Sequence, residues 1–117
     1  MPQEPLQLEE VADAQNGLLI LRLIGPILLS NFFPLQAWLR GSTAPSLILD
    51  LTRVPYIDSA GIGALVGAYV THQKSGRSLA LVGVTQRVRN TMQVTRVEPF
   101  FKFYDSLAAA EEEAAKP

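Results

Sequence analysis

Alternating and continuous runs of hydrophobic residues divide the chain into short strands and helices. Leu6-Gln7-Leu8 alternates between apolar and polar positions, and the stretch 18–24 is apolar apart from Arg22. Asn16-Gly17, between these two segments, is a dipeptide typical of tight hairpin turns. The pattern therefore predicts that the chain opens with a β-hairpin.

A segment whose apolar residues have helical spacing follows the predicted hairpin. Gly25-Pro26 ends the second predicted strand. Ser30 or Asn31 can then cap a helix that continues through Arg40. Pro34 fits this helix because it falls in the first turn, where its missing N–H group leaves no hydrogen bond unmade. One face of the predicted helix carries four apolar side chains, namely Phe32, Leu35, Trp38 and Leu39.

The middle of the chain has the pattern of a βαβ unit. Two apolar runs of strand length, 47–51 and 79–84, enclose a segment with helical spacing, 59–74. Ser75-Gly76-Arg77 ends that segment. Two strands joined by a helix are expected to lie parallel, with a right-handed crossover.

The last third of the chain continues the alternation of helix and strand. A third helix is predicted over about 86–94, a last strand over 100–104, and a final helix from the capping residue Ser106 to about Ala115. The predicted order is ββαβαβαβα. This order indicates an α/β fold, with one mixed sheet of about five strands and about four helices. Since no repeat or linker interrupts it, we expect a single domain over residues 1–117 with a core at about 6–110.

The composition limits the chemistry that the chain can perform. Hydrophobic residues make up 48% and charged residues 18%, which is typical of globular proteins. A formal net charge of -1 gives no overall field that favours nucleic acid or an anionic membrane. The chain has no cysteine and a single histidine, His72, so we expect neither a metal site nor a cofactor.

The apolar stretch 18–29 is not the sequence of a membrane helix. It is too short to cross a bilayer, and Arg22 and Pro26 interrupt it. The first ten residues carry acids in place of the basic region of a secretory signal. We therefore expect a cytoplasmic protein without membrane insertion.

The segment Ile57-Asp58-Ser59-Ala60-Gly61-Ile62-Gly63 lies where the crossover of the central strand becomes its helix. In open α/β sheets, ligands and reactive groups collect at the carboxyl ends of strands. A serine there is expected beside unpaired helix N–H groups and the positive end of the helix dipole, a position that suits an attached phosphate. The alternative is that Asp58 and Ser59 are only helix caps.

Three glycines lie in the same predicted helix. Gly61, Gly63 and Gly67 each cost about 1 kcal/mol relative to alanine in helix propensity. Two explanations remain open. Either the helix packs closely on the sheet, or the backbone of a partner approaches Ser59.

The stretch 47–63, Leu-Ile-Leu-Asp-Leu-Thr-Arg-Val-Pro-Tyr-Ile-Asp-Ser-Ala-Gly-Ile-Gly, resembles the signature of STAS domains. That signature is a hydrophobic strand, a short turn and then Asp-Ser-Ser/Thr-Gly-Leu-Gly. The similarity continues through Ser75-Gly76 and the segment 79–89, and extends weakly back to 18–25. Within this family the chain resembles bacterial anti-sigma-factor antagonists. The resemblance implies that Ser59 is the residue that accepts a phosphate.

Two positions depart from the antagonist pattern. Leu28 stands in the place of an Asp that lies near the phosphorylation site in antagonists. The surrounding stretch 25–31 instead resembles STAS domains attached to transporters of the sulfate-permease type. Ala60 replaces a Ser or Thr, so a secondary acceptor is missing.

The resemblance implies phosphorylation-controlled binding without catalysis. The unmodified surface would dock on a serine kinase that is also an anti-sigma factor, phosphorylation of Ser59 would release it, and a serine phosphatase would reset it. The predicted contact residues are Asp58, Ser59, Ala60, Gly61, Ile62 and Leu65. The alternative is a constitutive interaction module, or a small-ligand or nucleotide-binding module, of a transporter or lipid-trafficking system. In that case Ser59 only caps a helix.

A hydrolytic site built on Ser59 and His72 is opposed by geometry. On one helix the two residues are thirteen positions apart, or about 20 Å, far beyond hydrogen-bond reach. His72 is therefore predicted to be a surface residue of the helix.

The segment from Lys74 to Lys102 is locally basic. It contains four arginines, and Glu98 is its only acid. Either these charged side chains only keep the surfaces of two helices and their loops in contact with water, or they form a contact for an acidic partner surface. Nucleic acid is not expected, because no aromatic platform is interleaved with them.

Overall fold

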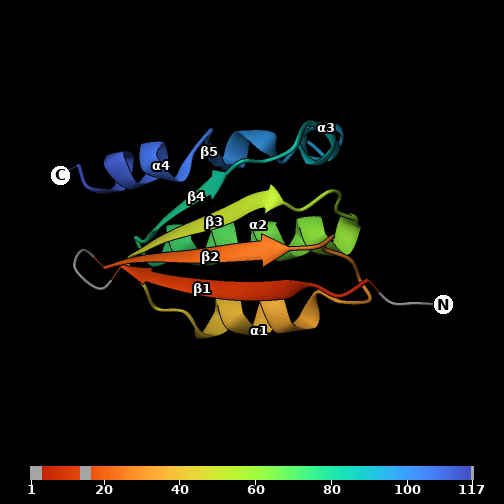
Figure 1. The fold of residues 1–117 in the computed structure, drawn as a ribbon, viewed down its shortest axis with the longest axis horizontal. Helices are drawn as coiled ribbons and strands as arrows, with labels where there is room; N and C mark the ends of the chain where they lie inside the picture. The colour runs from red at the N-terminus through yellow and green to blue at the C-terminus, as the bar shows by residue number, and fades with distance from the viewer. Residues whose placement is uncertain (1–3, 14–16, 117) are drawn as a thin grey trace.

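The computed structural model describes residues 4–13 and 17–116, and these form one mixed sheet flanked by helices (Figure 1). The predicted α/β order is confirmed, with a short 3-10 helix, η1, added before the last strand. The elements are β1 (Gln7–Asp13), β2 (Leu18–Ile24), α1 (Phe33–Gly41), β3 (Ser46–Arg53), α2 (Ser59–Lys74), β4 (Ser78–Val82), α3 (Gln86–Val94), η1 (Glu98–Phe100), β5 (Lys102–Tyr104) and α4 (Leu107–Ala114).

The strands lie in the sheet in the order in which they occur along the chain. β1 and β2 are antiparallel, which confirms the predicted hairpin, and the pairs β2–β3, β3–β4 and β4–β5 are parallel. Leu49 at the centre of the sheet pairs with Leu21 on one side and Leu81 on the other. Of the predicted turn, Gly17 has a positive φ of 67°, and Asn16 lies outside the described residues.

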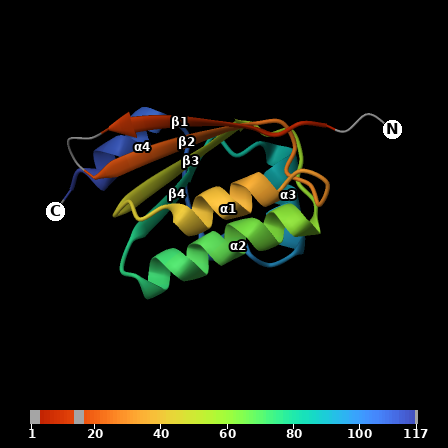
Figure 2. The same ribbon diagram turned by 90° about the horizontal axis from the view of Figure 1, so that it is seen from below.

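Helices cover both faces of the sheet. α1 and α2 lie side by side on one face, with their first turns at the same end (Figure 2). The main core lies between them and the inward side chains of the strands, among them Leu21, Leu23 and Leu49. A smaller cluster on the opposite face packs Ile20 and Ile48 against α4. Because β3 is covered on both faces, its residues 47–51 are all buried, and all of them except Asp50 are apolar.

The first helix begins later than predicted, and neither Ser30 nor Asn31 caps it. Its N-cap residue is Phe32, which makes no capping hydrogen bond from its side chain. Asn31 instead ties down the preceding loop, since its Oδ1 accepts from the Leu28 N–H at 2.9 Å and its Nδ2 donates to the Pro26 carbonyl at 2.9 Å. The capping prediction is wrong because the loop needs the same side chain for its own backbone groups.

His72 is buried, so the prediction of a surface residue is wrong. Its exposed fraction is 2%, because it falls on the same face of α2 as Leu65 and Ala68, which point to the core. Nδ1 lies 2.7 Å from the Ala68 carbonyl and donates a hydrogen bond to it. Burial is the main cause that lowers the pKa of His72, outweighing the opposite effect of this hydrogen bond.

This burial predicts that the protein loses stability as the pH falls through the ordinary range of histidine. The pKa of His72 is lower in the folded chain than in the unfolded chain, where it is near 6.5, so the unfolded chain takes up a proton first and acid favours unfolding. Between pH 7.5 and 5.5 the free energy of unfolding should fall by up to about 1.4 kcal/mol through this group. Urea unfolding at the two pH values measures the change. Since the chain has one histidine, His72→Gln should remove that part of the difference, and an equal pH dependence in both proteins would contradict the assignment.

Candidate functional site: the turn at Asp58 and Ser59

Asp58 holds together the turn between β3 and α2. Its Oδ1 accepts hydrogen bonds from the Ala60 and Gly61 N–H groups at 2.9 and 3.1 Å, which makes it the N-cap of α2. Its Oδ2 accepts from the Leu29 N–H at 3.0 Å, which joins the turn to the β2–α1 loop. The capping alternative is therefore confirmed for Asp58. The expectation of unpaired N–H groups at this helix start is wrong for Ala60 and Gly61, because Asp58 occupies them.

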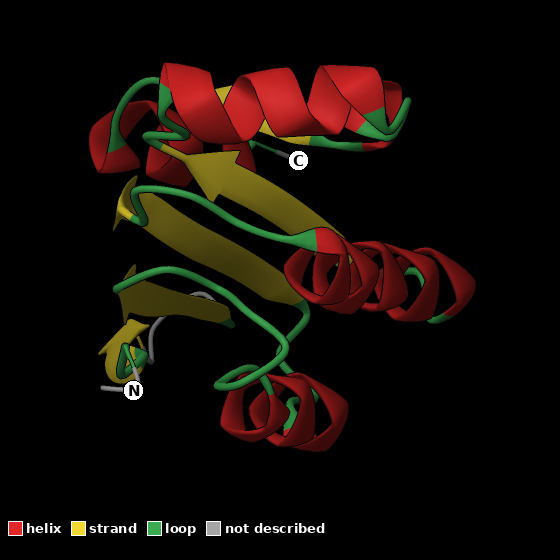
Figure 3. Ribbon diagram, turned by 90° about the vertical axis from the view of Figure 1, so that its right-hand side faces the viewer, coloured by secondary structure: helices red, strands yellow, loops and turns green. Residues whose placement is uncertain are grey.

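Ser59 is the first residue of α2, and it is exposed. Figure 3 views the molecule from the carboxyl ends of the parallel strands, the end at which α1 and α2 begin. Since Asp58 is the cap, the Ser59 side chain is not needed to start the helix. Its hydroxyl lies at the rim of the domain, where an active site of another protein can reach it.

The other predicted contact residues differ in exposure. Ala60 is half-buried, whereas Gly61 and Ile62 are buried. Leu65 has an exposed fraction of 0%, and its side chain is part of the main core. The prediction that Leu65 contacts a partner is therefore wrong. Leu65 lies further along α2 than the exposed first turn, on the side of the helix that faces the core.

Gly61 is required by close packing. An added Cβ would lie 2.6 Å from the Ile27 carbonyl oxygen and would overlap the side chain of Ile57. These two isoleucines form an isolated parallel bridge, and the Asp58 N–H donates to the Ile27 carbonyl at 3.1 Å. The packing explanation for the glycines is confirmed at this position. At Gly63 and Gly67 no heavy atom lies within 4 Å of an added Cβ, so packing explains neither.

Two exposed apolar side chains beside the turn were missed by the sequence analysis. Leu29 is 62% exposed and Phe33 is 61% exposed. Leu29 is joined to Asp58 through its backbone, and Phe33 opens α1 beside the first turn of α2 (Figure 2). The available signal was the run Ile27-Leu28-Leu29 in a segment with neither strand nor helix periodicity. The site is thus an exposed serine with two exposed apolar side chains, Leu29 and Phe33, at the same end of the domain. Leu28, the neighbour of Leu29, stands where antagonists are expected to carry an acid.

The locally basic segment is partly neutralised within the fold. Arg89 forms an ion pair with Glu98 and lies 3.7 Å above the Phe103 ring, and its hydrogen bond is the main cause that lowers the pKa of Glu98. Arg77 donates to the Ser42 carbonyl at 2.8 Å, and Arg87 lies over the Tyr56 ring. These three side chains have structural partners, which favours the solvation alternative for them.

The described residues contain neither a membrane-spanning helix nor a cluster of metal ligands. None of the helices within residues 4–13 and 17–116 combines the length and the apolar character needed to cross a bilayer. Within the same ranges, no three His, Asp or Glu side chains come together in a way that could hold a metal ion.

Comparison with known proteins places this geometry in a family. The STAS domain family model matches residues 10–110. An anti-sigma-B factor antagonist from Listeria monocytogenes is 37% identical over 49 residues, which cover 42% of this chain and 43% of the relative. The alignment thus spans less than half of the relative's length.

Solved structures share the fold over most of the chain. An anti-sigma factor antagonist from Mycobacterium paratuberculosis has a TM-score of 0.79 and 19% identity over 95% of both chains. The phosphorylated form of the Bacillus cell fate determinant SpoIIAA has a TM-score of 0.69 and 17% identity, over 92% of this chain and 98% of its own. A sulfate transporter family protein from Wolinella succinogenes has a TM-score of 0.70 and 27% identity over 84% of both chains. Because the family model matches most of its residues, the chain belongs to the STAS domain family.

Proposed function

We propose that this STAS domain is an anti-sigma-factor antagonist whose binding is controlled by phosphorylation of Ser59. The observation that carries the proposal is the exposed hydroxyl of Ser59, on a helix start that Asp58 fixes independently. The Listeria relative named as an antagonist supports it. The partner is a serine kinase that also acts as an anti-sigma factor, a serine phosphatase restores the unmodified form, and all of them act in the cytoplasm.

The unmodified surface would bind the partner through its exposed and half-buried members. These are Asp58, Ser59 and Ala60 from the turn, with Leu29 and Phe33 beside them. Gly61 and Ile62 lie beneath this surface and shape it. Exposed apolar side chains next to a small polar turn are suited to an interface with an apolar centre and a polar rim. Leu29 and Phe33 would supply that apolar centre.

Phosphorylation would release the partner by electrostatics. The Ser59 Oγ–P bond forms as the bond to the γ-phosphorus of ATP breaks, ADP leaves, and the hydroxyl proton passes to a base of the kinase. The phosphate adds about -1.5 to -2 charges next to Asp58. Because Asp58 already occupies the Ala60 and Gly61 N–H groups, these two donors are not free to neutralise the new charge. Repulsion and the cost of desolvation then oppose an interface built for a hydroxyl.

The second candidate is a constitutive module of a transporter or lipid-trafficking system. In this candidate the rim around Ser59 can instead bind a nucleotide or another small ligand. The observation that favours it is the β2–α1 loop, where Leu28 replaces the expected acid and Asn31 fixes the backbone. The similarity to the Wolinella sulfate transporter family protein points the same way. In this alternative Ser59 carries no phosphate.

Phosphate transfer to the purified protein distinguishes the two candidates. The protein is incubated with ATP and the candidate serine kinase encoded nearest to its gene, and modified residues are mapped by mass spectrometry. We expect a single phosphate at Ser59, none in Ser59→Ala, and full labelling in Ser30→Ala, which removes an exposed serine from the neighbouring loop. A phosphate at Ser30 alone, or none with a kinase that binds the protein, would rule out the proposed switch.

A further inference from the structure

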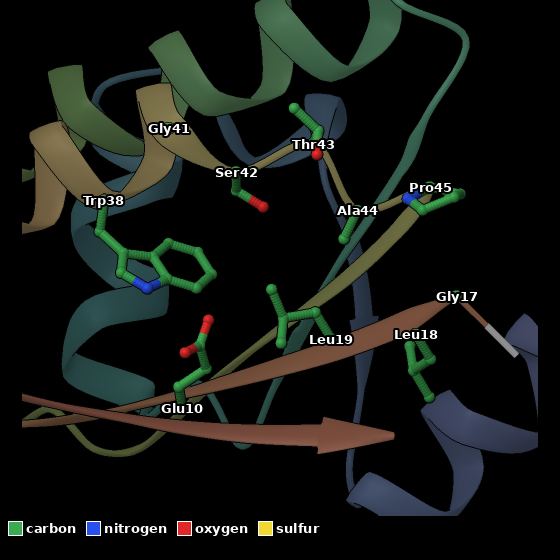
Figure 4. A pocket seen from close by; sticks show the side chains of 10 residues that line it. All are labelled: Glu10, Gly17, Leu18, Leu19, Trp38, Gly41, Ser42, Thr43, Ala44 and Pro45. Atoms are coloured by element: carbon green, nitrogen blue, oxygen red, sulfur yellow. The ribbon is translucent and has the colours of Figure 1, made fainter. Parts of the chain in front are cut away.

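A cavity of about 590 Å³ lies at the other end of the sheet from Ser59, beneath the β1–β2 hairpin. It is open to solvent on one side and lined by β1, the start of β2, the end of α1 and the loop before β3 (Figure 4). A hydrogen bond of 3.3 Å from the Ser46 N–H to the Gly17 carbonyl joins the starts of β2 and β3 beside it. The volume is in the range of sites that take small molecules.

Glu10 is exposed, but it lies on the same face of β1 as Leu6 and Leu8, where the strand pattern favours an apolar residue. Side chains on one face of a strand recur at every second position, and Leu6 and Leu8, which precede it on this face, pack against the main core. Figure 4 shows the Glu10 carboxylate directed into the cavity, toward Trp38. Glu9, on the opposite face, is paired with Arg22 at 3.5 Å. Glu10 takes part in none of the ion pairs formed among the described residues.

The other walls combine an apolar surface with one unsatisfied hydroxyl. Trp38 presents its indole to the cavity opposite Leu19 (Figure 4). Ser42 Oγ is buried, and among the described residues it has no hydrogen-bond partner. Figure 4 shows this hydroxyl directed into the same space. A buried polar group without a partner is costly. A rotation of the Ser42 side chain that opens its hydroxyl to the cavity would let an N–H group of a ligand satisfy it.

We propose that this cavity binds a small organic amine with an aromatic or otherwise apolar body. The ammonium group lies between the Glu10 carboxylate and the Ser42 hydroxyl, and the body packs against Trp38 and Leu19. A cation beside an indole is further stabilised by the ring's negative face. Among the described residues that line the cavity, Glu10 is the only charged one, so repulsion disfavours an anionic ligand.

The proposed site is physically separate from Ser59. The cavity lies at the amino end of β3 and Ser59 follows its carboxyl end. Eight strand residues at about 3.3 Å each place the two sites about 25 Å apart. Amine binding therefore does not depend on the proposed phosphorylation switch, and either proposal can fail without the other.

Tryptophan fluorescence tests the site directly, because Trp38 is the only tryptophan in the chain. The full-length protein is titrated with 2-phenylethylamine, 2-phenylethanol and 3-phenylpropionate, each up to about 10 mM, a range suited to ligands of this size. We expect a saturable change in emission with the amine, binding at least about fivefold weaker with the neutral alcohol, and none with the acid. No saturable change with the amine, or equal binding of amine and acid, would overturn the proposal.

Two glutamate variants locate the charge that selects the amine. Glu10→Gln should weaken binding of 2-phenylethylamine about tenfold and leave 2-phenylethanol unchanged. Glu9→Gln, the matched change on the opposite face of the same strand, should leave both unchanged. Circular dichroism establishes that both variants are folded. Equal amine affinities of the two variants would show that Glu10 does not form the site, whatever the outcome of the titrations above.

Discussion

Ser59→Asp is expected to weaken binding of the partner kinase by about 100-fold or more, whereas Ser59→Ala should stay within about threefold of the unmodified protein. The aspartate places a permanent charge beside Asp58, whose Oδ1 and Oδ2 are already committed to backbone donors. A like charge at an interface costs several kcal/mol, and a factor of 100 is about 2.7 kcal/mol. Isothermal titration calorimetry with the purified partner measures both affinities.

A neutral variant of similar size separates charge from bulk. Ser59→Asn has nearly the shape of Ser59→Asp without its charge, so it should bind at least about tenfold more tightly than the aspartate variant. Because Ser59 is exposed and does not cap α2, none of the three changes should unfold the protein. Equal affinities for Ser59→Asp and Ser59→Ala would show that charge is not the switch and would favour the constitutive module.

Gly61→Ala is expected to destabilise the fold by about 2 kcal/mol, although the same change ordinarily stabilises a helix. The added methyl group would lie 2.6 Å from the Ile27 carbonyl oxygen, and a backbone atom cannot move aside as a flexible side chain can. Because the clash is with backbone, the cost should lie at the upper end of the range for overpacking, about 3 kcal/mol, and the gain of about 1 kcal/mol in helix propensity leaves about 2 kcal/mol. Urea unfolding monitored by circular dichroism gives the difference.

Two other glycines of α2 provide matched controls for this prediction. At Gly63 and Gly67 an added methyl group meets no heavy atom within 4 Å, so each change to alanine should stabilise the protein by about 0.5–1 kcal/mol. The sign of the effect should therefore reverse within one helix. If Gly61→Ala were also stabilising, the close contact between α2 and the β2–α1 loop would be absent in solution.

The same contact links the fold to the proposed switch. Gly61 lets the start of α2 approach Ile27, and this approach brings the Leu29 N–H to Asp58. The apolar pair Leu29 and Phe33 is thereby held beside the turn that presents Ser59. A partner that binds this surface would contact the hydroxyl and its apolar neighbours together. The domain could therefore bind a partner without the acid that Leu28 replaces.

The element order and the position of Ser59 were accessible from the sequence because the forces behind them are local. Strand and helix periodicities, turn residues and capping chemistry act over a few positions, and they placed α2 and α3 with the bounds that the structure has. The family signature adds the expected role of the serine. Asp58 as the cap and Ser59 at the first helical position also follow from neighbours in the sequence.

The tertiary structure decided which of these side chains meet one another. His72 is polar, but the face of α2 on which it lies packs against the core, and packing overrides its polarity. Leu29 is apolar, but its N–H donates to Asp58, which is 29 positions away in the sequence, and this bond holds the loop before α1 at the rim. Glu10 on β1 faces the same cavity as Trp38 and Ser42 at the end of α1 only because the fold brings these elements together. Burial and proximity depend on pairs of residues distant in sequence, so the sequence alone determined the elements and the turn, while the exposed surface and the cavity required the fold.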